Sequence, residues 1–141
     1  TINVLSGSEC NGETNLARLL ETLAPSILEG EFVFCTVKDG MYGDFSETMP
    51  IASFMEAEGL TLVLSKASAD ALGMDYEGVF NCITLNVHSS LEAVGLTAAV
   101  AGKLAEQGIS ANIIAGYFHD HVFVPLLDAS IALRLLKSNS A

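Results

Sequence analysis

Basic residues are scarce in this sequence. Its 141 residues include six Lys and Arg against 17 Asp and Glu, which gives a formal net charge of -11. Such a surface repels phosphate backbones and anionic lipids, so we expect no nucleic-acid partner and no membrane partner. The sequence also lacks an apolar run long enough to span a bilayer, and we find no secretory signal in it.

Cysteine is almost as scarce. Cys10, Cys35 and Cys82 are too few and too scattered for a disulfide framework or a four-Cys zinc site, so we expect a reducing, cytoplasmic setting. Cys35 and Cys82 fall in predicted strands, and we interpret both as inert core thiols. The sequence has no phosphate-binding loop and no dinucleotide fingerprint, so no cofactor is expected.

What the sequence does contain is enough apolar material for a core, since half of its residues are hydrophobic. Its charge is unevenly distributed. Residues 1–78 hold 13 acidic and 3 basic residues, whereas residues 79–141 hold 4 acidic and 3 basic residues. This shift predicts a boundary near Tyr76–Gly78, with one domain over residues 1–77 and a second over residues 78–138.

In the first part, periodic leucines predict a helix that ends before Pro25. β-Branched and aromatic residues predict a strand, and the turn at residues 57–59 predicts a hairpin, followed by a short helix closed by Gly73. The predicted elements are the strand Phe32–Val37, the hairpin strands Ile51–Glu56 and Leu60–Ser65, and the helix Ser68–Leu72.

The second part predicts the element order β-α-β-β-α. The elements are a strand Val79–Val87, a helix from Gly95 to Gln107, a strand Ser110–Phe118, a turn at His119 and Asp120, a strand His121–Val124, and a last helix with Leu127, Ile131 and Leu135 one turn apart. This order is ferredoxin-like but lacks its fourth strand. We therefore predict an α+β fold of two ferredoxin-like units with antiparallel sheets, helices on one face, and a shared or exchanged edge strand.

Residues 91–114 carry a resemblance to a known family. Gly95 precedes a helix that closes with Leu104, Ala105, Gly108 and Ile109, followed by Asn112. This pattern resembles an ACT domain, and the whole chain is similar to small standalone bacterial proteins with two such units. The resemblance implies a regulatory protein without catalytic activity that binds a free amino acid at a domain interface. Together with the missing edge strand, it predicts a homodimer.

The physics of the helix start supports this location independently. Unpaired N–H groups and a partial positive charge at a helix N-terminus suit a ligand carboxylate, and a glycine lets the ligand approach the backbone. The predicted ligand-binding residues are Ser89, Ser90, Glu92, Val94, Gly95, Leu96, Asn112, Ile113 and Ile114.

Several alternatives stay open at this point. Gly95 also fits a plain turn glycine, Glu92 a solvated acid, and Asn112 a side chain bonded to its own backbone. Catalysis at His88 beside Ser89 lacks any accompanying nucleophile motif. His119, Asp120 and His121 form a weak metal-binding hypothesis. A ligand-free module that assembles with protein partners through sheet edges is the main alternative to amino-acid binding.

Overall fold

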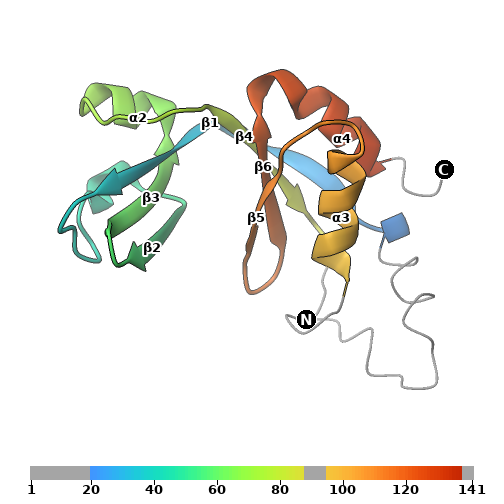
Figure 1. Ribbon diagram of the computed structural model, residues 1–141, viewed down its shortest axis with the longest axis horizontal. Coiled ribbons are helices and arrows are strands. Elements are labelled where there is room, and N and C mark those ends of the chain that lie inside the picture. The colour runs from blue at the N-terminus through green and yellow to red at the C-terminus, as the bar shows by residue number, and fades with distance from the viewer. Residues whose placement is uncertain (1–19, 88–94, 138–141) are drawn as a thin grey trace. The chain divides into compact units, whose positions relative to one another are not determined.

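The computed structural model describes residues 20–87 and 95–137 (Figure 1). Their elements are β1 (Pro25–Val37), η1 (Ser46–Thr48), β2 (Ala52–Glu56), β3 (Gly59–Ser65), α2 (Lys66–Ala71), β4 (Phe80–Leu85), α3 (Leu96–Ala105), β5 (Asn112–Ala115), β6 (Asp120–Pro125), η2 (Leu126–Asp128) and α4 (Ala129–Lys137). The strands form a six-stranded antiparallel sheet in the order β2-β3-β1-β4-β6-β5. No helix within these residues is long and apolar enough to cross a membrane.

These residues pack as two compact units. The 29–81 unit is Glu29–Asn81, and the C-terminal unit combines the described parts of Thr1–Leu28 and Cys82–Ala141. The division at residues 77 and 78 remains a prediction from the charge distribution.

In the 29–81 unit, β3 is the central strand of three antiparallel strands in the order β2-β3-β1. It pairs with β1 from Phe32↔Ser65 to Val37↔Leu60, and with β2 through a short hairpin as predicted. The buried side chains that form the hydrophobic core of this unit are Val33, Cys35, Leu60, Leu62, Leu64 and Ala69.

Helix α2 begins two residues before its predicted start at Ser68. The Ser65 hydroxyl accepts a hydrogen bond from the Ser68 backbone N–H at 3.1 Å, so Ser65 is the residue that caps the helix. The predicted helix start at Ser68 is therefore two residues late.

In the C-terminal unit, α3 and α4 pack on one face of the sheet, where Figure 1 shows them side by side. Alternate residues of β4 and β6 meet buried residues of both helices, as the period-two pattern of the strands requires. The contributions from these four elements are Ile83, Leu85, Leu96, Val100, Leu104, Val122, Val124, Ala129, Ala132 and Leu136.

The missing fourth strand of this unit comes from the start of β1. Leu23, just before β1, is 1% exposed and belongs to the same core. The Asn86 side-chain amide, just after β4, donates to the Ala24 carbonyl at 2.8 Å and to the Ser26 hydroxyl at 2.9 Å. The order β1-β4-β6-β5 is therefore the ferredoxin-like order, completed by the first half of the chain as predicted.

The predicted hairpin of the C-terminal unit is wrong in detail. β5 is shorter than predicted, and the turn lies at residues 116–119, where the Gly116 N–H donates to the His119 carbonyl at 2.8 Å. Asp120 is the first residue of β6 and not a turn residue. Tyr117 and Phe118 at the turn stack edge to face on each other, with ring centroids 4.9 Å apart.

The last helix forms as predicted, but of its three apolar residues one turn apart only Leu135 packs against the core. Leu127 is 94% exposed and Ile131 is 42% exposed. The buried residues of α4 are Ala129, Ala132 and Leu136. Two of them are alanines, whose small size lets the helix backbone approach the sheet closely, so the largest side chains do not mark the inner face.

Candidate functional site

Gly95 sets the start of α3. Its φ of 93° lies in the left-handed region, which a glycine adopts without the strain that a side chain would add. Its carbonyl accepts the first helical hydrogen bond from the Ala99 N–H at 2.9 Å, and the adjacent Leu96 is 3% exposed within the core. The buried Leu96 therefore anchors the start of the helix in the core.

This helix start carries the features of an anion-binding end. Gly95 offers no side-chain cap to the N–H groups of the first turn, and that turn contains no acidic residue. Within residues 95–137, these N–H groups therefore have no carboxylate of their own helix to neutralise their partial positive charge. A ligand carboxylate is the group that such an end accepts.

Asn112, the first residue of β5, lies at the opposite end of α3 from Gly95. The ten residues of α3 span roughly 15 Å at 1.5 Å per residue. Asn112, which is exposed, follows the end of this helix, whereas Gly95 precedes its start. Ile113 and Ile114 are half-buried and continue β5 toward the Gly95 end. Gly95 and Asn112 of one chain are thus too far apart to hold one amino acid together.

Asp120 is a carboxylate that sequence reasoning did not assign to the site. It begins β6 and alternates with Val122 and Val124, so it lies on the sheet face that α3 and α4 cover. Figure 1 shows the β5–β6 turn and the first turn of α3 at the same end of this unit. The alternation of Asp120 with two buried valines could have shown this from the sequence. We missed it because Asp120 was predicted to lie in the turn and not in the strand.

Burial raises the pKa of Asp120, an effect that the charges of His121 and His119 oppose. A cationic partner stabilises the ionised form of a partly buried carboxylate, because its positive charge offsets the cost of desolvation. Asp120 is therefore a candidate partner for a cationic group at this end of the unit.

The metal hypothesis for residues 119–121 finds no support in this geometry. Neighbouring residues of a strand face opposite ways, so Asp120 and His121 diverge. His121 Nδ1 lies 3.0 Å from the Thr84 hydroxyl, and burial lowers the pKa of this histidine. Among residues 20–87 and 95–137, no three His, Cys, Asp or Glu side chains converge on a metal site.

The two described cysteines are buried and free, as interpreted from the sequence. Burial raises the pKa of Cys82 to about 11, and burial together with Asp75 raises the pKa of Cys35. Neither thiol has the low pKa of a reactive cysteine. The predicted residues Ser89, Ser90, Glu92 and Val94, together with His88 and Cys10, lie outside the described residues.

Comparison with protein families decides the classification. One ACT domain model matches residues 11–81, and a second ACT domain model matches residues 77–138. The chain belongs to the ACT domain family. Both halves of this ACT protein therefore share the ferredoxin-like fold that its strand order shows.

Solved structures agree with this assignment. A Vibrio cholerae protein, described as of unknown function and as a possible transport protein, is 50% identical, with a TM-score of 0.84 over 93% of this chain and 100% of that chain. An Agrobacterium tumefaciens protein is 15% identical, with a TM-score of 0.68 over 82% and 87% of the two chains. The regulatory subunit of aspartate kinase from Thermus thermophilus is 10% identical, with a TM-score of 0.57 over 82% and 95%. The last two similarities concern the fold alone. No curated protein matches the chain.

Proposed function

We propose that this ACT protein is a non-catalytic regulatory module that binds a free amino acid at the start of α3. The observation that carries the proposal is the uncapped first turn of α3, opened by Gly95 in a left-handed conformation, in a unit that matches an ACT domain model. In this arrangement the ligand carboxylate accepts hydrogen bonds from the first-turn N–H groups, and its ammonium group pairs with Asp120.

Because α3 separates Asn112 from Gly95 within one chain, a second copy of the chain supplies Asn112 to the site. β5 is the last strand of the described sheet, so a second β5 can pair with it in antiparallel fashion. With the two-fold axis between Ile113 and Ile114, such a pairing would set Asn112 of the partner subunit opposite Ala115, at the end where α3 begins. Residues 79–141 are nearly neutral, so two copies meet there without strong repulsion. We propose a homodimer formed at this edge, with the partner subunit's Asn112 completing each site.

The setting that we propose is cytoplasmic, because Cys35 and Cys82 are free and buried and suit a reducing compartment.

Thermal unfolding in the presence of each proteinogenic amino acid tests this function. We expect one amino acid, or a small chemically related group, to raise the melting temperature as its concentration rises. A ligand at about 100 times its Kd adds roughly 2.7 kcal/mol to the free energy of unfolding. Calorimetric titration then gives the Kd, and sedimentation shows whether the protein is a dimer.

Two glycine variants separate ligand binding from backbone strain. Gly95→Ala and Gly108→Ala both place a side chain at a left-handed position, with φ of 93° and 75°, at opposite ends of α3. We expect both to lower the melting temperature but only Gly95→Ala to weaken binding, by at least tenfold. Asp120→Asn should also weaken binding, with the effect confined to ligands that carry a free ammonium group.

Absence of any amino-acid effect on the melting temperature would contradict the proposal. Equal loss of binding in Gly95→Ala and Gly108→Ala would move the site away from the start of α3. A stable dimer without amino-acid binding would favour the ligand-free interaction module.

A further inference from the structure

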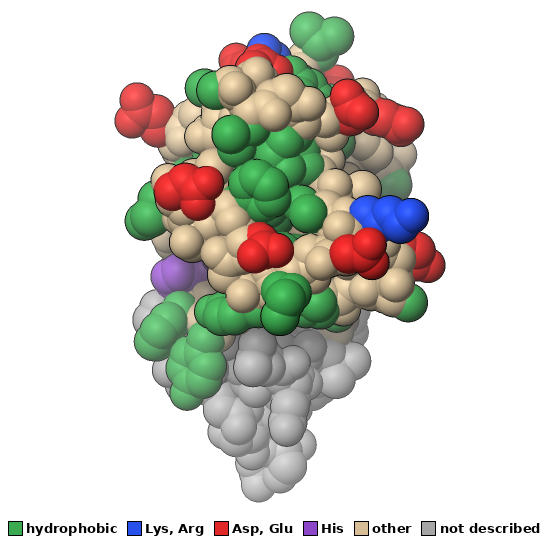
Figure 2. All heavy atoms as spheres, turned by 90° about the vertical axis from the view of Figure 1, so that its left-hand side faces the viewer, with side chains coloured by type: hydrophobic (Ala, Val, Ile, Leu, Met, Phe, Trp, Pro, Cys, Tyr) green, Lys and Arg blue, Asp and Glu red, His purple; other side chains and the backbone are tan. Residues whose placement is uncertain are grey.

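The 29–81 unit exposes an unusual number of large apolar side chains in one short segment. We define the 41–55 patch by the residues there whose side chains are more than half exposed, which are Met41, Tyr42, Met49, Phe54 and Met55. Figure 2 shows hydrophobic side chains gathered on a face of the protein with acidic side chains around them. Clusters of this kind mark interaction sites more often than scattered apolar residues do.

The loop that presents the patch has a defined structure of its own. The Met41 N–H donates to the Asp44 carboxylate at 2.9 Å, and the Thr48 hydroxyl donates to the Phe45 carbonyl at 2.7 Å. Phe45 and Met49 both have positive φ, at 63° and 53°, which bulky residues adopt only when their surroundings impose it. The loop backbone that carries Met41, Tyr42 and Met49 is therefore held in a defined conformation.

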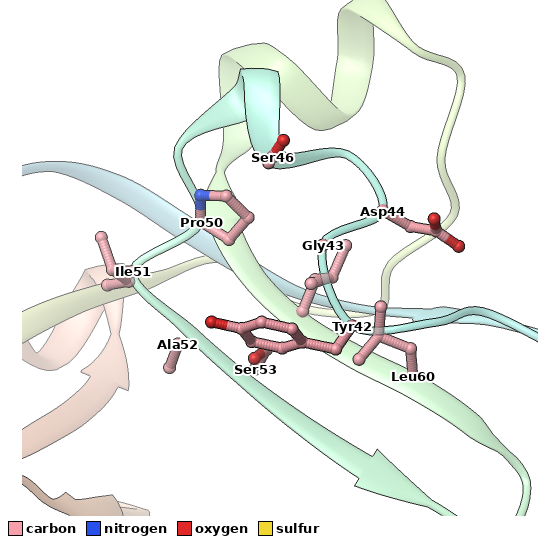
Figure 3. A pocket seen from close by; sticks show the side chains of 10 residues that line it. Tyr42, Gly43, Asp44, Ser46, Pro50, Ile51, Ala52, Ser53 and Leu60 are labelled. Atoms are coloured by element: carbon pink, nitrogen blue, oxygen red, sulfur yellow. The ribbon is translucent and has the colours of Figure 1, made fainter.

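A cavity of about 300 Å³ opens beside this patch, between the loop and strands β2 and β3 (Figure 3), and Tyr42 belongs to both. Its lining includes the buried Leu60 and Leu62, and the Tyr42 ring extends across it toward Ala52 and Ser53. The Asp44 side chain points away from this ring, so the carboxylate lies outside the apolar part of the cavity. The cavity suits an apolar side chain inserted from outside, with charge around its opening.

The charge around the patch has a single sign. Residues 39–58 contain five acidic residues and no Lys or Arg, and the 29–81 unit contains ten acidic residues against two lysines. One of those lysines, Lys66, is paired with Asp70 at 2.9 Å. A second copy of this face would bring like charges together, whereas a basic partner would be attracted. The charge thus favours a basic occupant over self-association.

The sheet edge indicates the conformation of this occupant. β2 is the end strand of the described sheet, and its residues Ser53 to Glu56 are exposed. An edge strand offers backbone N–H and C=O groups to an extended segment, which adds as a further strand.

We propose that the 41–55 patch is a docking site for an extended, basic segment of another protein. The segment pairs with β2, inserts an apolar side chain into the cavity, and places Lys or Arg beside the acidic residues. This surface belongs to the 29–81 unit and does not depend on the amino-acid site proposed at α3.

A pair of synthetic peptides tests the proposal on the full chain. One alternates Lys with Val and the other, of the same length, alternates Glu with Val, and binding is followed by fluorescence anisotropy. We expect the Lys peptide to bind and the Glu peptide not to bind.

Two double variants test whether the patch is the binding surface. Met49→Ser with Phe54→Ser should weaken binding of the Lys peptide at least tenfold without a change in net charge. Tyr117→Ser with Phe118→Ser removes exposed aromatic surface from the C-terminal unit and should leave binding unchanged.

The substituted side chains are exposed, so circular dichroism and melting temperature should match the parent protein. Equal binding of the Lys peptide to parent and Met49→Ser/Phe54→Ser proteins would overturn the proposal, because charge alone would then explain it. Binding of the Glu peptide would overturn it as well, and so would a parent dimer in sedimentation that Met49→Ser/Phe54→Ser converts to a monomer. Each readout is taken without an amino acid, so a failed ligand screen leaves this test unaffected.

Discussion

Gly40 and Gly102 meet different structural demands although both are glycines. Gly40 is buried in the turn after β1, where its N–H donates to the Val37 carbonyl at 3.0 Å. A Cβ there would lie 2.9 Å from both the Leu60 Cβ and the Val37 oxygen. Gly102 lies inside α3, and a Cβ on it would meet no atom within 4 Å. The close approach of two strands, rather than backbone flexibility, explains the first glycine.

We therefore expect opposite effects from the same substitution at these two positions. Gly40→Ala should lower the free energy of unfolding by about 1–3 kcal/mol, since the neighbouring backbone cannot move aside. Gly102→Ala should raise it by about 0.5–1 kcal/mol, because alanine loses less entropy than glycine on entering a helix. Urea unfolding of both variants measures this difference, and a stable Gly40→Ala protein would contradict the packing described.

At the scale of elements, α3 and α4 differ in how well sequence pattern predicts them. In α3, the large apolar residues at helical spacing are also the buried ones, namely Leu96, Val100 and Leu104. In α4, apolar residues occur on more than one side, and the alanine-rich side packs inward. A periodic pattern identifies the helix, but the inner face depends on the space that the sheet leaves.

This difference gives a matched test within α4 and the turn before it. Leu136 is fully buried, so Leu136→Ala should cost about 2–5 kcal/mol of unfolding free energy. Leu127 is 94% exposed, so Leu127→Ala should change it by less than about 0.5 kcal/mol. Chemical denaturation of the two variants gives both values. Similar losses would instead support a leucine stripe on the inner face of the helix.

At the scale of the whole molecule, the C-terminal unit is not made from one continuous stretch of chain. Leu23 fills its core and the start of β1 lies beside β4. Without them, the Asn86 side chain loses both of its acceptors, Ala24 and Ser26, and one side of β4 loses its partner strand. Folding of this unit therefore requires residues from the first part of the sequence.

A fragment covering residues 78–141 should accordingly show no cooperative thermal transition. Attaching residues 20–31 to its C-terminus through a flexible linker should restore the transition, because Leu23 and the edge strand return to the same chain. Circular dichroism melting of the two fragments is the measurement. A fragment that melts cooperatively without the added strand would show that the first part is dispensable for this unit.

Sequence alone determined the element types, the ferredoxin-like order and its missing strand, because hydrophobic periodicity and turn residues are local properties. It also indicated Gly95, since a glycine directly before a periodic helix is visible in the chain. Only the tertiary structure showed that Gly95 and Asn112 lie far apart, that Asp120 lies on the α3 side of the sheet, and that the 41–55 patch is exposed. These three findings depend on the length of α3, on which strand residues face the helices, and on which surfaces are covered. Such properties arise only when distant segments pack together.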